Sequence, residues 1–263
     1  MKHLLFALFA ALLLTLQPLR AQGFDHGHAL WNEVVATHVK GDRFDYAALE
    51  KDRAKLDAYL KQLAAVGPKE LEGWSREQRY AFWINAYNAN CIALVLSEYP
   101  LDSIKDIGNW FSPVWDKRFI AMTALDPKGK GRKLSLTDIE HEILRPQFKD
   151  ARVHAAINCA SLSCPPLRNE AFVAERLDAQ LDDSTRKWLA DPTRNRFEPA
   201  KARAQLSAIF DWFKDDFERD GGRREFLAKF GPAEHGAWLR GEAKLEIGFL
   251  DYSWKLNDVA KAK

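Results

Sequence analysis

The chain has 263 residues, of which 47% are hydrophobic and 29% charged, with 39 Lys and Arg against 37 Asp and Glu. This near-neutral balance argues against a nucleic-acid partner, because nucleic-acid-binding proteins use a surplus of basic residues to displace counterions. The length and apolar content suffice for one substantial core that needs no disulfides, and three Cys leave at least one thiol unpaired within a monomer.

The first 21 residues have the composition of a secretory signal peptide. Lys2 supplies a positive charge, residues 4–14 form an apolar run too short to span a bilayer comfortably, and the small residue Ala21 precedes the expected cleavage site. No later apolar run reaches the roughly 20 residues of a membrane helix. We therefore expect residues 22–263 to be released as a soluble periplasmic or secreted protein without a membrane anchor.

The next segments predict helices. Apolar residues recur at three- and four-residue spacing over residues 30–39 and 51–66, which is typical of amphipathic helices. Ser75 and Gln78 have the spacing of a capping box ahead of the longest apolar segment. This segment, residues 76–98, is expected to be the central helix.

The middle of the chain changes pattern. Short apolar runs between residues 118 and 136 flank a Gly-rich turn, which predicts a β-hairpin. Thr137 and Glu140 have the spacing of a second capping box, opening a short helix that we expect to end before Pro146.

The remaining segments predict further helices over residues 169–189, 208–218 and 224–230, followed by a closing strand within residues 245–256. Neither an internal repeat nor a linker interrupts the pattern. We therefore predict one α+β domain over residues 22–263, helix-rich and with a small, mostly antiparallel sheet.

Two amides lie in the predicted central helix among aromatic residues that favour burial. Asn85 and Asn88 are three residues apart and share one helical face. A buried amide without partners costs roughly 1 to 3 kcal/mol, so each must be hydrogen-bonded. Either these amides bind neighbouring backbone, or they bind or orient a ligand.

A carboxylate and an imidazole are adjacent at Glu140 and His141. A carboxylate can orient a general base, but neighbouring helical residues diverge by about 100°, so this pair does not contact directly. Glu140 is therefore either a helix cap or an acid-base group. His141 either projects towards the segment after Pro146 or is a satisfied core histidine.

The richest segment, residues 152–167, contains two Cys, a His and an Asn among small and apolar residues. A Cys close to an imidazolium or to backbone N–H groups has a lowered pKa and becomes a nucleophile. His154 and Cys159 share no face of a regular element, so their pairing requires a turn at Asn158, or His141 acts instead. The alternative is a disulfide from Cys159 to Cys164, whose spacing closes a small loop in an oxidising compartment.

Five blocks together resemble the family called domain of unknown function 547: AFWINAYNANCIALVL, SPVW, LSLTDIEHEILRP, RVHAAINCASLSCPPL and FLDYSWKLN. The resemblance extends from about Phe44 to Asn257. The family's motif positions fall on Asn85, Asn88, Glu140, His141, His154, Asn158 and Cys159. In plant relatives the position of Cys164 is commonly Ser while that of Cys159 stays Cys, which implies that Cys159 acts alone. Ala155 departs from the family, which often has an aromatic residue there.

Two functions remain open. The first is a thiol-dependent hydrolase or acyl-transferase, in which Cys159 is a reduced nucleophile, His141 or His154 the base, with Glu140 beside them and Asn85, Asn88 and Asn158 binding or orienting the substrate. The second is a non-catalytic envelope module that binds a ligand or partner and contains a Cys159–Cys164 disulfide. A thiol-redox role lacks the usual Cys-x-x-Cys spacing. We expect a small-molecule or peptide partner, no cofactor and no metal.

Overall fold

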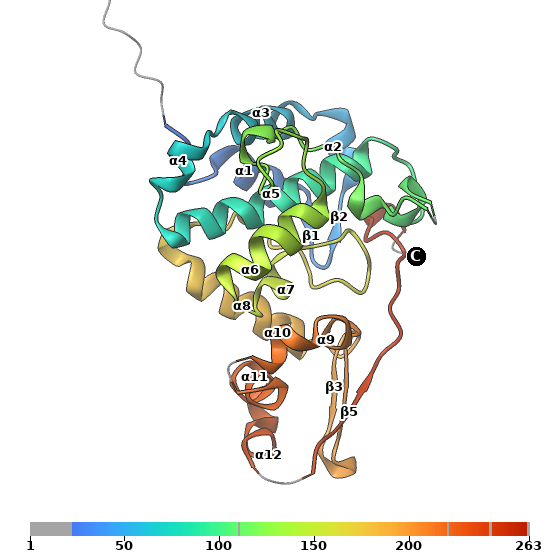
Figure 1. Cartoon of the computed structure of the whole chain (residues 1–263). Helices are drawn as coiled ribbons and strands as arrows, with labels where there is room; N and C mark the ends of the chain where they lie inside the picture. The colour runs from blue at the N-terminus through green and yellow to red at the C-terminus, as the bar shows by residue number, and fades with distance from the viewer. Residues whose placement is uncertain (1–22, 110, 220, 242–243, 262–263) are drawn as a thin grey trace, which may run out of the picture.

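The computed structural model describes residues 23–109, 111–219, 221–241 and 244–261 (Figure 1). The expected signal peptide, residues 1–21, lies outside them. In the described part of the chain, no helix combines the length and the apolar character that crossing a membrane requires. Helices dominate and two small sheets accompany them, so the predicted helix-rich α+β class is confirmed.

The first hydrophobic core surrounds α5 (Arg76–Leu96), of which 16 of 21 residues are buried. It is the predicted central helix, and the predicted capping box of Ser75 and Gln78 is present at its start. Four shorter helices and a two-stranded antiparallel sheet pack against it: α1 (Ala29–His38), α2 (Tyr46–Lys51), α3 (Ala54–Ala65), α4 (Pro68–Glu72), β1 (Val39–Lys40) and β2 (Arg43–Phe44).

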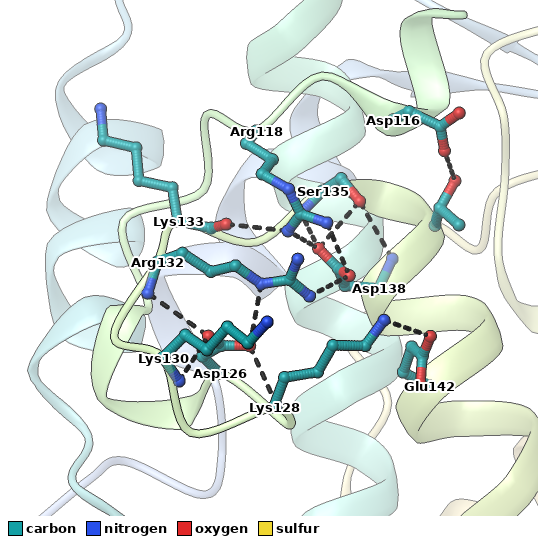
Figure 2. A network of polar contacts seen from close by, with 11 residues as sticks. Asp116, Arg118, Asp126, Lys128, Lys130, Arg132, Lys133, Ser135, Asp138 and Glu142 are labelled. Atoms are coloured by element: carbon teal, nitrogen blue, oxygen red, sulfur yellow. Dashed lines mark hydrogen bonds and ion pairs between the residues drawn. The ribbon is translucent and has the colours of Figure 1, made fainter.

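The hairpin expected between residues 118 and 136 is not formed. One isolated bridge joins Ile120 to Leu134, and the short 3₁₀ helix η3 (Thr123–Leu125) lies between these two residues. Two further 3₁₀ helices, η1 (Ile104–Ile107) and η2 (Val114–Asp116), precede this region. The Asp126 carboxylate accepts hydrogen bonds from the backbone N–H groups of Lys128, Lys130 and Arg132 (Figure 2). The loop therefore folds around a carboxylate, which replaces the ladder that a hairpin needs.

The helical segment that follows this loop contains a proline, Pro146. The π-helix η4 (Asp138–Leu144) continues directly into α6 (Arg145–Phe148), so the expected stop before Pro146 is wrong. Pro146 is the second residue of α6 and comes directly after the π-helical segment. The short helices α7 (Val153–Ala156) and η5 (Ala174–Arg176) and the longer α8 (Leu177–Ala190) follow.

A second hydrophobic core lies below the first in Figure 1 and is built on Trp188 of α8, whose ring stacks on Phe210. In its three-stranded sheet β4 is central, antiparallel to β3 and parallel to β5. The remaining elements are β3 (Arg196–Glu198), η6 (Pro199–Lys201), β4 (Arg203–Leu206), α9 (Ile209–Trp212), α10 (Lys214–Glu218), α11 (Arg223–Phe230), η7 (Ala233–His235), α12 (Gly236–Arg240) and β5 (Glu246–Phe249).

After β5 the chain returns to the first core, as the red segment of Figure 1 shows. Leu162 N–H donates to the carbonyl of Lys255 at 2.8 Å, and Leu256 N–H donates to the carbonyl of Asp102 at 2.7 Å. The chain closes with η8 (Val259–Lys261). This returning segment therefore lies beside the Cys-containing loop and connects the two cores.

Candidate functional site: an aromatic pocket between the two cores

A cavity of about 180 Å³ lies where the two cores and the returning segment meet. Six aromatic side chains form much of its wall: Tyr87, Trp115, Trp212, Phe213, Tyr252 and Trp254. The rings of Trp212 and Trp254 are stacked, 5.6 Å apart with an interplanar angle of 12°. The four candidate catalytic residues of the sequence analysis line the same cavity: Glu140, His141, His154 and Cys159.

The predicted amides lie outside this cavity lining, buried against backbone. The Asn85 side chain donates to the carbonyl of Phe172 at 2.7 Å and accepts from the N–H of the same residue at 3.1 Å. Asn88 likewise donates to the Ala156 carbonyl at 2.9 Å and accepts from the N–H of Asn158 at 2.8 Å. The first of the two alternatives is therefore what the structure shows: the polar groups of both amides hold two chain segments against α5, and a role in binding a ligand stays a prediction.

Asn158 is also a positioning residue. Its side chain donates to the carbonyl of Pro165 at 2.8 Å and accepts from the N–H of Ala160 at 2.8 Å. Ala160 has a φ of 63°, so the chain reverses there in the left-handed region. This turn brings Cys159 and Cys164 together.

Cys159 and Cys164 form a disulfide, so the expectation of a reduced Cys159 is corrected for this state of the protein. The Tyr252 hydroxyl lies 3.2 Å from each sulfur, and the Ser161 hydroxyl lies 3.3 Å from the sulfur of Cys159. The third cysteine, Cys91, is buried within α5, and burial raises the pKa of its thiol. Both cysteines of the disulfide line the pocket.

Glu140 is free to face the pocket because a different pair caps the helix. The expected Thr137–Glu140 capping box is wrong, since the Thr137 hydroxyl donates to Asp116 instead. The reciprocal bonds are made two residues earlier: Ser135 N–H donates to the Asp138 carboxylate at 2.9 Å, and Asp138 N–H donates to the Ser135 hydroxyl at 3.1 Å.

Two arginines from outside η4 also bind Asp138, its first residue. Arg118 and Arg132 both pair with its carboxylate (Figure 2). The π-helical winding that begins here places Glu140 and His141 at the pocket, and π-helical turns are frequent at functional sites. Burial raises the pKa of Glu140 to about 7, and its carboxyl group lies 3.5 Å from the Tyr87 hydroxyl.

His154 is buried and paired with an acid that sequence patterns do not single out. Its Nε2 lies 2.8 Å from Oδ2 of Asp216, and its ring packs against Phe213 at 4.1 Å. Burial lowers the pKa of His154, against the raising effect of Asp216. Burial alone would raise the pKa of Asp216, but hydrogen bonds from His154 and Arg145 hold it well below its usual range.

His141 lies at the edge of the cavity and is exposed. The Arg145 guanidinium donates to its Nδ1 at 2.7 Å, so a neutral imidazole carries its proton on Nε2. Burial of the ring, and then the charge of Arg145, lower the pKa of His141. Arg145 also donates to Asp216 at 2.6 Å, which links both imidazoles through one arginine and one aspartate.

Four further residues belong to this site, and the sequence could have indicated two of them. Tyr252 and Trp254 fall in the fifth block of the family resemblance. Asp216 and Trp212 lie in an ordinary amphipathic segment, where neither periodicity nor spacing distinguishes them. Within the described ranges, no group of three or more His, Cys, Asp or Glu side chains is arranged to hold a metal ion.

Comparison with known proteins gives one match. Residues 71–189 match the family described as "Protein of unknown function, DUF547". The match includes α5, η4 and the Cys-containing loop and ends within α8, before Trp212 and Tyr252. No curated protein and no solved structure matches the chain.

Proposed function

We propose that this protein, whose residues 71–189 match the DUF547 family, binds the compact aromatic ring of a small molecule in the pocket between its cores. The observation that carries this proposal is the cavity itself: aromatic walls contributed by both cores, with a disulfide where a nucleophilic thiol was expected. Binding sites occur preferentially at such junctions and are lined mostly by apolar side chains with a few polar groups.

The size of the cavity limits the ligand. About 180 Å³ is close to the roughly 150 Å³ of an engineered cavity that holds one benzene molecule. It is well below the roughly 300 to 1,000 Å³ of pockets that enclose drug-sized molecules. A larger ligand therefore inserts one ring and leaves the rest of its structure outside.

The polar groups of the pocket suit a ring with an oxygen substituent. A Glu140 carboxyl with a pKa of about 7 is mostly protonated in mildly acidic solution, where it donates a hydrogen bond to a ligand oxygen. The Tyr252 hydroxyl offers a second polar contact on the disulfide side of the pocket. The aromatic walls supply the apolar contact area.

We also propose that binding takes place outside the cytoplasm. Residues 1–21 have the composition of a secretory signal peptide, and disulfides persist in oxidising compartments. Both observations support a periplasmic or secreted protein. Mass measurement of the protein from the exported fraction tests this, because retention of Met1 there would contradict it.

The binding proposal is tested with phenol and benzyl alcohol. Each probe is titrated into the oxidised protein while the indole N–H resonances of the tryptophans are followed by NMR. We expect selective shifts for Trp115, Trp212 and Trp254. Trp212→Ala removes one wall at a site that is 48% exposed, and we expect about tenfold weaker binding from the lost ring contacts.

Phe111→Ala is the matched control, because Phe111 is 94% exposed and lies outside the pocket lining. This variant should bind both probes as the wild type does. Binding that is absent at millimolar probe, or that weakens equally in both variants, would overturn the proposal.

A second candidate function is a thiol-dependent hydrolase or acyl-transferase that acts after the disulfide is reduced. It is favoured by one observation, the His154–Asp216 pair, since His154 lines the same pocket as both sulfurs. In that form the hydroxyls of Tyr252 and Ser161 lie beside the sulfur of Cys159 and can stabilise a thiolate.

This candidate is tested on protein reduced with dithiothreitol and then freed of it. Alkylation of Cys159 by iodoacetamide should be faster than that of buried Cys91, and His154→Gln should slow it. His235→Gln is the control, because His235 lies outside the pocket lining. Reduced protein that hydrolyses p-nitrophenyl acetate no faster than Cys159→Ser would exclude the hydrolase.

A further inference from the structure

We infer that the ligand carries an anionic group, bound by Arg145, Lys149 and Arg219 in a groove next to the aromatic pocket. This inference rests on the proposed function and names the chemical class of ligand: a compact ring joined through a short spacer to a carboxylate or phosphate.

The groove has a volume of about 390 Å³ and shares one residue, His141, with the aromatic pocket. The His141 side chain therefore stands between the two spaces. A ligand whose ring lies against Phe213 on one side of this imidazole can place a substituent beside Arg145 on the other.

The charges of the groove do not balance. Among the residues that the structure describes, three cations line it with a single carboxylate, that of Asp216, which pairs with Arg145 and Arg219 and also contacts His154. Among the described residues, Lys149 has no carboxylate within ion-pair distance. Each arginine keeps N–H groups that Asp216 does not use. The groove therefore offers a net positive charge together with free donors.

Nearby carboxylates are engaged elsewhere. Glu142 pairs with Lys128 at 3.0 Å, and Asp116 accepts from Thr137 at 2.7 Å. Neither lines the groove. The surplus of positive charge is therefore left for a group from outside the chain.

The guanidinium groups of the two arginines are also held in place. Arg145 bonds to Asp216 and His141, and its guanidinium lies 4.8 Å from the centre of the Phe213 ring. The Arg219 guanidinium bonds to the other oxygen of the same Asp216 carboxylate. A donor set fixed before binding loses little entropy when an anion arrives.

The test compares anionic probes with neutral ones of matched length. Phenylacetate, 3-phenylpropanoate and benzyl phosphate are titrated against 2-phenylethanol, 3-phenylpropan-1-ol and benzyl alcohol, with tryptophan indole N–H shifts as the readout. We expect at least one anion to bind about tenfold more tightly than its neutral partner, with the advantage falling as NaCl is raised. Comparing the two carboxylate probes with benzyl phosphate shows which of the two anionic groups the groove binds.

Lys149→Gln and Arg219→Gln should each remove most of this advantage and leave the neutral probes unchanged. Lys61→Gln, an exposed lysine on α3 outside the groove, is the control for net charge. Anions that bind no better than alcohols would overturn the inference and leave the proposed function standing. Probes that all bind independently of Trp212 would instead overturn the proposed function.

Discussion

Replacing Glu140 by glutamine should remove a pH-dependent cost to folding. Burial raises the pKa of this carboxyl to about 7 from an ordinary value of 4.5. Below pH 4.5 the group is protonated in both the folded and the unfolded protein, so it contributes nothing. As the pH rises from 4.5 to about 7, the unfolded chain has lost this proton while the folded protein keeps it, so stability falls; above that range both states are ionised and the loss is complete.

The size of the effect follows from that pKa difference. Each pKa unit corresponds to 1.36 kcal/mol, so the free energy of unfolding falls by up to about 3 kcal/mol between pH 4.5 and pH 8 through this one group. The side chain keeps some contact with solvent, and screening there makes this value an upper bound. Glu140→Gln keeps the shape and one hydrogen-bond donor without the titration.

Urea unfolding of the oxidised proteins at pH 5 and pH 8 measures the effect. The wild type should lose more stability over this interval than Glu140→Gln, by about 1 to 3 kcal/mol. The histidines that titrate in the same range are present in both proteins, so the difference between the proteins isolates Glu140. Glu142→Gln is the control, because Glu142 is exposed and paired with Lys128.

One result would refute the argument: equal losses of stability in the wild type and Glu140→Gln. Glu140 would then titrate near its ordinary pKa, and the pocket would hold an ionised carboxylate rather than a hydrogen-bond donor at mildly acidic pH. Neutral ring binding would then rely on the aromatic walls and the Tyr252 hydroxyl.

Three other predictions concern stability and are measured by urea unfolding. Asn88→Ala should destabilise the protein by about 3 kcal/mol, because two buried backbone groups lose their partners, whereas Asn90→Ala removes one bond within α5 and should cost about 1 kcal/mol. Asp216→Asn should cost about 3 to 5 kcal/mol, since a buried charge network loses its only carboxylate. Reduction of the Cys159–Cys164 disulfide should lower stability by about 2 kcal/mol, the loop-closure value for so short a loop.

Local sequence signals predicted the first core well. The capping box at Ser75 and the apolar run after it depend only on neighbouring residues, and α5 begins where they indicate. The second capping box was misassigned because two pairs overlap with the same spacing, Ser135 with Asp138 and Thr137 with Glu140. Arginines from outside the helix bond to Asp138, and no local pattern reveals them.

Long-range partners also limited the prediction of the site. Asp215 and Asp216 are adjacent in the sequence, and only the fold shows that Asp216 is the one that contacts His154, 62 positions away. The expected pairing of an imidazole with Cys159 assumed a reduced thiol. The left-handed turn at Ala160 that joins Cys159 to Cys164 depends on Asn158 and on the backbone that Asn158 holds.

The polar residues within the apolar segments form two groups, the amides and the titratable side chains. An amide has both a donor and an acceptor, so Asn85 satisfies the N–H and the carbonyl of one residue at once and needs no further partner. An ionised carboxylate only accepts hydrogen bonds and an imidazolium only donates them, so the hydrogen bonding of these groups changes with their protonation state. Glu140 and His154 line the cavity, and their partners, Tyr87 and Asp216, are themselves hydroxylic or ionisable. Buried polar groups need hydrogen bonds, and the amides meet this need by fixing the backbone. The titratable groups meet it in a pocket whose donors and acceptors change with pH.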